Sequence, residues 1–169
     1  MEHFQLEENH AENILESSDV AVDVESGLAI AVIKPDAFIN KDQILKRLED
    51  SGLYIVKTVT KRLPDNFVIG TMYKDLPKGI EEETLKHFNI GSSEIILLRG
   101  GSDIVEQLVK ITGDKTRPNE CSDESIRYIF GEHFGRNAGE DKTYFRNAIH
   151  RGKDAEEKKA DLDKFEHLL

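Results

Sequence analysis

The apolar run Leu28-Ala-Ile-Ala-Val-Ile33 and the Lys34-Pro35-Asp36 that follows it decide the fold. Six apolar residues are too few for a helix, so this run is expected to be a strand buried on both faces. Pro35 favours extended geometry at Lys34 and ends the strand there. The folded part of the chain therefore begins with a buried strand that carries a lysine at its end.

The residues after this strand alternate between strand and helix patterns. Further strands are expected at Leu53–Arg62, Glu94–Leu98 and Tyr144–Ile149. Helices are expected at about Lys41–Asp50, Asp65–Met72, Ile80–Phe88, Ser102–Gly113, Asp123–Phe130 and Asp154–Leu169. This order predicts an α/β sandwich of four strands with the helices on one side.

Capping residues mark the starts of three of these helices. Ser102 is expected to cap one helix, and Asp154 with Glu157 forms a capping box before the last one. Asp123 and Glu124 are expected to open a short helix, at the end where the helix dipole favours negative charge.

Length and composition are those of one domain, or of one domain with a tail. A chain of 169 residues buries a proper core, and its longest apolar runs are far shorter than the roughly 18–20 residues that cross a membrane. The N-terminus lacks the pattern of a secretory signal. The single cysteine, Cys121, excludes an intramolecular disulfide and a cysteine-rich zinc site. A cytoplasmic protein is expected.

The net charge of −10 comes mostly from the N-terminus, because residues 1–26 hold eight acidic residues and no lysine or arginine. Such a segment repels nucleic acid and anionic lipid, so neither is an expected partner. It is either a solvated, disordered tail or a short docked helix at Asn9–Ser17, and its polar composition favours the tail. We therefore expect an acidic extension at 1–26 and a folded domain at 27–169.

The segment Asn147-Ala148-Ile149-His150 carries the most specific chemistry. A neutral imidazole is a good nucleophile near pH 7 and can accept a phosphoryl group. Elsewhere the chain offers cations and polar side chains that suit phosphate oxygens. The candidates are Lys34, Lys110, Thr116, Arg127 and Asn147.

Several segments together resemble the nucleoside diphosphate kinase family over about residues 28–166. They are Ala31–Ala37, Ile44–Gly52, Thr116–Pro118, Ser125–Arg127 and Asn147–His150, in the family's order and at about its spacing. The resemblance implies a ferredoxin-like βαββαβ sandwich (α+β), with a four-stranded antiparallel sheet and helices packed on it. It also implies transfer of the γ-phosphoryl group of a nucleoside triphosphate, such as ATP, to a nucleoside diphosphate through a phosphohistidine.

The same resemblance assigns roles to individual residues. It implies that His150 is the nucleophile and that Tyr73 lies beside it. It matches Lys34, Thr116, Arg127 and Asn147 to the phosphate and ribose contacts, and it places Lys110 where the family usually has an arginine. Mg²⁺ is then held mainly by the nucleotide's phosphates, with no protein metal site, and a homo-oligomer is expected.

Other positions depart from the family's pattern. Gly152 stands where the family usually has a serine that helps link the histidine to a carboxylate. Asp161, eleven residues after His150 on the last expected helix, is expected to orient the imidazole through a neighbouring group. The aromatic residue that stacks on the base is missing near Ile80–Glu81. About ten extra residues lie between Arg127 and Asn147, and they include Gly135–Asp141, which is expected to be an exposed, glycine-rich loop.

Each candidate residue also has an ordinary structural interpretation. His150 alone is compatible with a surface or capping histidine, Thr116 with a turn residue, and Tyr73 with a core residue. Three classes of function follow: an active kinase, a nucleotide-binding relative whose chemistry is weak or lost, and an interaction protein that keeps only the scaffold. No role is assigned to His87 or His133.

Overall fold

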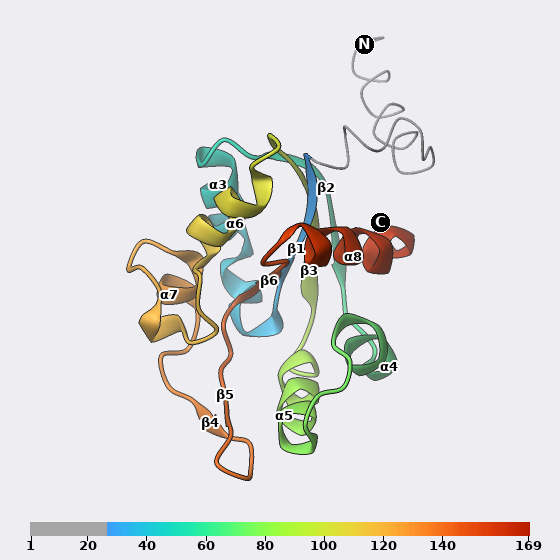
Figure 1. Ribbon diagram of the computed structural model, residues 1–169, viewed down its shortest axis with the longest axis vertical. Helices are drawn as coiled ribbons and strands as arrows, with labels where there is room; N and C mark the ends of the chain where they lie inside the picture. The colour runs from blue at the N-terminus through green and yellow to red at the C-terminus, as the bar shows by residue number, and fades with distance from the viewer. Residues whose placement is uncertain (1–26) are drawn as a thin grey trace.

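The computed structural model describes residues 27–169, and its centre is a four-stranded sheet (Figure 1). The strands are β1 (Leu28–Ile33), β2 (Tyr54–Lys61), β3 (Ser93–Arg99) and β6 (Ile149–Arg151). Their order is β2-β3-β1-β6, and every neighbouring pair is antiparallel. This is the predicted ferredoxin-like arrangement, and the prediction of four antiparallel strands is confirmed.

Strand β1 is buried along its whole length because sheet neighbours flank it and helices cover both its faces. Its side chains alternate between two hydrophobic clusters. Ala29, Ala31 and Ile33 belong to one cluster, whereas Ile30 and Val32 belong to the other. The continuous apolar run in the sequence thus reflects burial on two faces.

Helices cover both faces of the sheet, so the predicted one-sided arrangement is wrong (Figure 1). One face is covered by α3 (Lys41–Asp50), α6 (Ile104–Thr112) and α7 (Ile126–Phe130). The other is covered by α4 (Asp65–Phe67), the π-helical turn Val68–Met72, the end of α5 (Lys78–Phe88), and α8 (Ala155–Phe165). The helices of this second layer were predicted, but hydrophobic periodicity does not say which face of the sheet a helix covers.

Short 3-10 helices complete the chain. They lie at Pro35–Asn40, directly after β1, at Pro118–Glu120, and at Glu166–Leu168 after α8. The first of them turns the chain at Lys34 and places the side chain of Asp36 beside β6.

The predicted strand Tyr144–Ile149 is wrong in extent. Tyr144 belongs to a separate hairpin formed by β4 (Arg136–Asn137) and β5 (Thr143–Tyr144), while β6 pairs with β1 over only three residues. Ala148 explains the break, since its φ of 72° lies in the left-handed region and interrupts extended geometry. The extra residues therefore form a hairpin, and Ala138 within the predicted exposed loop is buried.

Two of the three predicted helix starts need correction. The residue before α6 is Asp103, which makes no side-chain cap, and α7 is capped by Ser125, whose hydroxyl accepts a hydrogen bond from Tyr128 N. The start of α8 is confirmed, because Asp154 Oδ1 accepts a hydrogen bond from Glu157 N at 2.8 Å. At both helices several polar residues are adjacent in the sequence, and the residue before the helix lies one or two residues later than the polar residue expected to start it.

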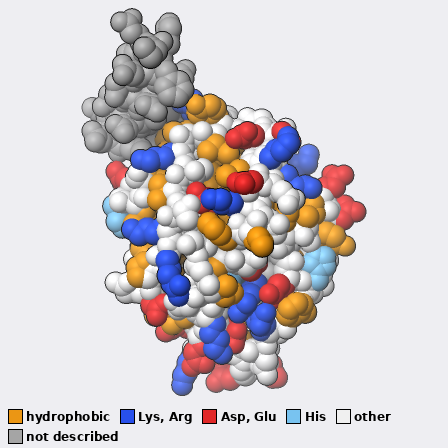
Figure 2. Space-filling view, turned by 180° about the vertical axis from the view of Figure 1, so that it is seen from behind, with side chains coloured by type: hydrophobic (Ala, Val, Ile, Leu, Met, Phe, Trp, Pro, Cys, Tyr) orange, Lys and Arg blue, Asp and Glu red, His pale blue; other side chains and the backbone are white. Residues whose placement is uncertain are grey.

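The predicted extension at residues 1–26 lies outside the described residues. Within 27–169, no helix is long and apolar enough to span a bilayer. The surface seen from behind in Figure 2 shows acidic and basic side chains interspersed over the described part of the chain.

Candidate active site

His150 lies in the middle of β6, opposite Val32 of β1, on the sheet face that α8 covers. Its Nε2 lies 3.0 Å from Oδ2 of Asp161, a buried residue of α8. Because an ionised carboxylate only accepts hydrogen bonds, this contact assigns the ring proton to Nε2 and leaves a lone pair on Nδ1. Asp161 thus orients the histidine directly, and the predicted intermediary group is absent from this contact.

Tyr73 lies beside the imidazole ring, next to Nδ1. Its hydroxyl is 3.4 Å from His150 Nδ1, and the two rings meet edge to face with centroids 5.5 Å apart. Burial raises the pKa of Tyr73 well above its ordinary value, so the hydroxyl keeps its proton. Tyr73 therefore presents a hydrogen-bond donor next to the nitrogen that carries the lone pair.

Lys34 joins the site from the end of β1. Its Nζ donates to Asn147 Oδ1 at 2.8 Å and lies 5.6 Å from the centre of the Tyr73 ring. Burial lowers the pKa of Lys34 to about 7, and the charge of Arg127 contributes further. Asn147 in turn donates from Nδ2 to the backbone carbonyl of Thr116 at 3.1 Å. Lys34, Asn147 and Thr116, which are far apart in the sequence, are therefore brought together.

The backbone beside His150 is held by two hydrogen bonds to the Lys34–Asp36 turn. Ala148 N donates to Asp36 Oδ2 at 3.0 Å, and Lys34 N donates to Ala148 O at 2.8 Å. Ala148 adopts the left-handed φ of 72°, which costs a non-glycine residue roughly 1–2 kcal/mol. These two bonds stabilise that conformation and fix the direction in which the chain enters β6.

Two buried arginines support the loop next to this cluster. Arg127 donates to the backbone carbonyls of Ile149, Gly113 and Lys115, at 2.9–3.4 Å. Arg151, which the sequence analysis did not single out, donates to Thr112 Oγ1 at 2.9 Å and to the same carbonyl of Gly113 at 2.6 Å. Both arginines thus meet at Gly113.

The electrostatics of these cations are unfavourable without a counter-ion. Burial lowers the pKa of Arg151 to about 10, and Arg127 is the next cause. The pKa of Arg127 is also lowered by burial, and both arginines lower that of Lys34. Burial thus destabilises the charged form of all three side chains, and neighbouring arginines add to this for Lys34 and Arg151, so an anion would be stabilised in this region.

The remaining predicted contacts lie further out. Lys110 is exposed on α6, and no contact among the described residues joins it to the cluster. The side chain of Thr116 is also exposed, although its carbonyl is bound by Asn147. The structure thus brings together His150, Tyr73, Lys34, Asn147 and Arg127, and leaves Lys110 at the periphery.

Gly152 is enclosed by the first turns of α8. A Cβ added to it would lie 2.6 Å from Lys158 N and 3.0 Å from Lys158 Cα, both backbone atoms. Any side chain here would push β6 and α8 apart, and with them His150 and Asp161. Glycine therefore lets α8 approach closely enough for an aspartate, with its short side chain, to reach the histidine.

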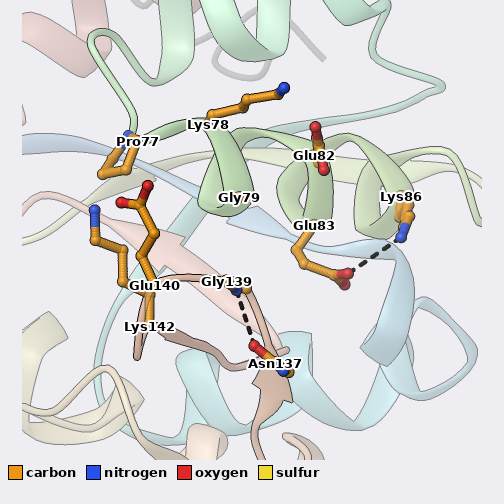
Figure 3. A pocket seen from close by; sticks show the side chains of 11 residues that line it. Pro77, Lys78, Gly79, Glu82, Glu83, Lys86, Asn137, Gly139, Glu140 and Lys142 are labelled. Carbon is orange, nitrogen blue, oxygen red and sulfur yellow. Dashed lines mark hydrogen bonds and ion pairs between the residues drawn. The ribbon is translucent and has the colours of Figure 1, made fainter.

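The hairpin β4–β5 packs against the N-terminal half of α5. A Cβ on Gly79 would lie 1.5 Å from Ala138 O, so the two backbones are in direct contact there. A cleft of about 510 Å³ lies around this contact (Figure 3). Its lining is mostly charged and contains no aromatic residue: Pro77, Lys78, Gly79, Glu82, Glu83, Lys86, Asn137, Ala138, Gly139, Glu140 and Lys142.

Comparisons with known proteins identify the family of this chain. A family model described as nucleoside diphosphate kinase matches residues 28–165. A thioredoxin domain-containing protein 3 homolog of Ciona intestinalis is 30% identical over 159 residues, which cover 87% of this chain and 22% of that protein. The chain therefore spans about a fifth of the length of this curated relative.

Solved structures show the same fold. A nucleoside diphosphate kinase of Aquifex aeolicus has a TM-score of 0.67 at 20% identity, covering 82% of this chain and 94% of that one. A nucleoside-diphosphate kinase of Borrelia burgdorferi, solved as a transition-state mimic with vanadate and ADP, has a TM-score of 0.67 at 16% identity and covers 82% of this chain and 85% of that one. On the family match, the chain belongs to the nucleoside diphosphate kinase family.

Proposed function

We propose that this protein is a nucleoside diphosphate kinase that carries the transferred phosphoryl group on Nδ1 of His150. The observation that carries the proposal is the orientation of the imidazole. Asp161 holds Nε2, so the nitrogen with the lone pair faces Tyr73, which in turn stacks beneath the buried cation of Lys34. A nucleophile held in one tautomer beside buried cations suits phosphoryl transfer.

The reaction proceeds in two halves at one site. Nδ1 attacks the γ-phosphorus of a nucleoside triphosphate, the bond from that phosphorus to the β-phosphate oxygen breaks, and the nucleoside diphosphate leaves with the electron pair. A β-phosphate oxygen of a second nucleoside diphosphate then attacks the phosphorus, and the bond to Nδ1 breaks. Asp161 stabilises the charge that develops on the ring while Nδ1 is bonded to phosphorus.

The protein's part is to hold the phosphates in line and to neutralise their charge. Lys34 supplies a buried cation whose charged form a phosphate would stabilise, and Tyr73 offers a hydroxyl donor. Arg127 and Arg151 give the Gly113–Thr116 loop its positive potential, with Thr116 and Lys110 as outer contacts for the nucleotide. Asn147 keeps Lys34 aimed at the site.

The residues fit a nucleotide that brings its own magnesium ion. The two carboxylates of the site, Asp36 and Asp161, are both engaged in hydrogen bonds, whereas the cations are placed to meet phosphates. Mg²⁺ keeps most of its waters and needs few protein ligands, so the phosphates would hold it. When bound, the ion would neutralise part of the phosphate charge.

A second candidate is a nucleotide-binding relative with weak or no transfer. The observation that favours it is the cleft beside α5, where the contact between Gly79 and Ala138 and the charged lining replace an aromatic slot for a base. Loss of base stacking would weaken nucleotide binding and leave the histidine intact.

Two measurements on the same preparations separate these candidates. Calorimetry with ADP measures binding, and incubation with γ-labelled ATP followed by acid and alkali treatment detects a phosphoenzyme. A kinase forms an acid-labile, alkali-stable phosphoenzyme that ADP discharges. The substitution His150→Gln should abolish this phosphoenzyme and leave the Kd of ADP within a few-fold of the wild-type value. His133→Gln is the matched control, since His133 is exposed, and it should leave phosphoenzyme formation and ADP binding unchanged. Binding of ADP without phosphoenzyme in the wild type would favour the second candidate.

A further inference from the structure

We propose that His87 is a positioning residue for His150, and that it connects the β4–β5 hairpin to the strand that carries the phosphoryl acceptor. The effect of His87 on the rate of phosphoryl transfer rests on the proposed function, whereas its effect on the conformation of the strand rests on hydrogen-bond geometry alone. His87 was assigned no role from the sequence. It is fully buried on α5, between the Lys34–Asp36 turn and the hairpin.

Both ring nitrogens of His87 are engaged. Nε2 lies 2.7 Å from Asp36 Oδ1, and Nδ1 lies 2.7 Å from the hydroxyl of Tyr144 in β5. The carboxylate accepts, so Nε2 carries the proton, and the Tyr144 hydroxyl donates to Nδ1. Burial lowers the pKa of His87 and outweighs the opposing effect of Asp36, which favours the neutral ring that this pattern requires. The direction of every hydrogen bond in the series is therefore determined.

The second oxygen of Asp36 extends the series to the active site. Oδ2 accepts the hydrogen bond from Ala148 N, and Ala148 is the left-handed residue two positions before His150. The carboxylate of Asp36 is almost wholly buried, with 4% of its side chain exposed. Without His87, one oxygen of that carboxylate would lose its partner in a place with little water, and the group would reorient. The backbone of Ala148 would then lose one of the two hydrogen bonds that hold it.

The other end of the series lies in the extra residues. Tyr144 pairs with Arg136 in the hairpin, and the hairpin meets α5 at Ala138 and Gly79. Figure 3 shows the two segments facing each other, with Gly139 and Asn137 at the hairpin and Gly79 on α5. The hairpin thus braces α5 and, through His87, the acceptor strand.

Three substitutions divide the series into its parts. His87→Leu removes both hydrogen bonds. His87→Gln keeps an N–H for Asp36, and Tyr144→Phe removes only the hydroxyl. Ile44→Val, a truncation in the core on the other face of the sheet, controls for lost stability. Each variant is measured for hydrogen exchange of the Ala148 amide without nucleotide, for the rate of phosphoenzyme formation at saturating ATP, and for the Kd of ADP.

We expect His87→Leu to raise the exchange rate of the Ala148 amide and to slow phosphoenzyme formation by at least about ten-fold, since small misplacements of a reacting group cost up to about a hundred-fold. The Kd of ADP should change by less than about three-fold, and His87→Gln should recover most of the rate. Tyr144→Phe should lie between His87→Gln and His87→Leu in the exchange rate of the Ala148 amide and in the rate of phosphoenzyme formation.

Exchange at Ala148 in His87→Leu equal to that in Ile44→Val would overturn the proposal, as would equal rates in His87→Leu and His87→Gln. A wild type without phosphoenzyme would refute the proposed function alone, because the exchange measurement needs no nucleotide and still decides whether His87 positions the strand.

Discussion

Single residues set the electrostatics of the site, and Lys34 is the clearest case. Its charged form is destabilised by burial and by Arg127 and Arg151, whereas the charge of Asp36 stabilises it. A lysine that titrates near neutrality gains most from an anionic ligand, which would restore its charge. The cost of burying this cation is also measurable in the absence of ligand.

Stability should depend on pH through Lys34. Its pKa is about 7 in the folded protein, below the ordinary 10.5 of an unfolded chain. The unfolded state therefore binds more protons between these values, the penalty is full below about pH 7, and stability rises with pH above it. Melting temperatures of the wild type relative to Lys34→Met should shift in favour of the wild type between pH 7 and 9. A difference independent of pH would mean that Lys34 titrates normally.

The loss of activity on replacing a cation of the site should be larger for a buried side chain than for an exposed one. Lys34→Ala and Arg127→Ala should each raise the activation free energy for kcat/KM by roughly 2–4 kcal/mol. Each removes a buried cation that would stabilise the charge redistributed during phosphoryl transfer. Lys110→Ala should cost under about 1 kcal/mol, since its side chain is exposed. Arg127→Ala should also lower the melting temperature, as three backbone carbonyls lose a donor. If Lys110→Ala were the most damaging, the site would be centred elsewhere.

At the scale of elements, the approach of α8 to β6 decides how the histidine is held. Sequence similarity alone suggests that Gly152 lacks a useful hydroxyl and that Gly152→Ser would raise the rate. The geometry argues the reverse, because a Cβ at Gly152 would meet the backbone of Lys158. Asp161 already reaches His150 at 3.0 Å, so a linking serine has no gap to fill.

Gly152→Ser should therefore lower both stability and rate. Overpacking against backbone costs about 1–3 kcal/mol, which corresponds to a fall in melting temperature of at least about 3 °C for a domain of this size. Gly91→Ser is the matched control, since a Cβ there has no neighbour within 4 Å. A faster enzyme with Gly152→Ser at unchanged melting temperature would contradict this account of the α8 contact.

At the scale of the whole molecule, the sequence predicted the sheet and made His150 the candidate acceptor, and it missed how the two are supported. Continuous burial of β1 and capping by Asp154 depend on local sequence, so they could be predicted. His87 is buried by contacts with Asp36 and with Tyr144 of the hairpin, which lie 51 and 57 residues away from it in the sequence. Arg151 was missed because a charged residue in a short strand is usually exposed.

The boundary of the folded unit is a prediction at this scale. The family match begins at residue 28, and all site residues lie within 27–169. Removing residues 1–26 should leave the melting temperature within about 5 °C and nucleotide turnover nearly unchanged, because the segment is acidic and carries no candidate site residue. A thermal melt and an exchange assay on the shortened chain measure both. A larger fall would show that the segment stabilises the domain.

The position of phosphorus on the histidine ring tests the central claim most directly. Protein labelled with ¹⁵N-histidine, treated with ATP and magnesium and observed by NMR at alkaline pH, distinguishes phosphorylation at Nδ1 from phosphorylation at Nε2. The Asp161 contact predicts a single phosphohistidine, at His150, with phosphorus on Nδ1 and a proton retained on Nε2. Phosphorus on Nε2 of His150, or on any other histidine, would contradict the account.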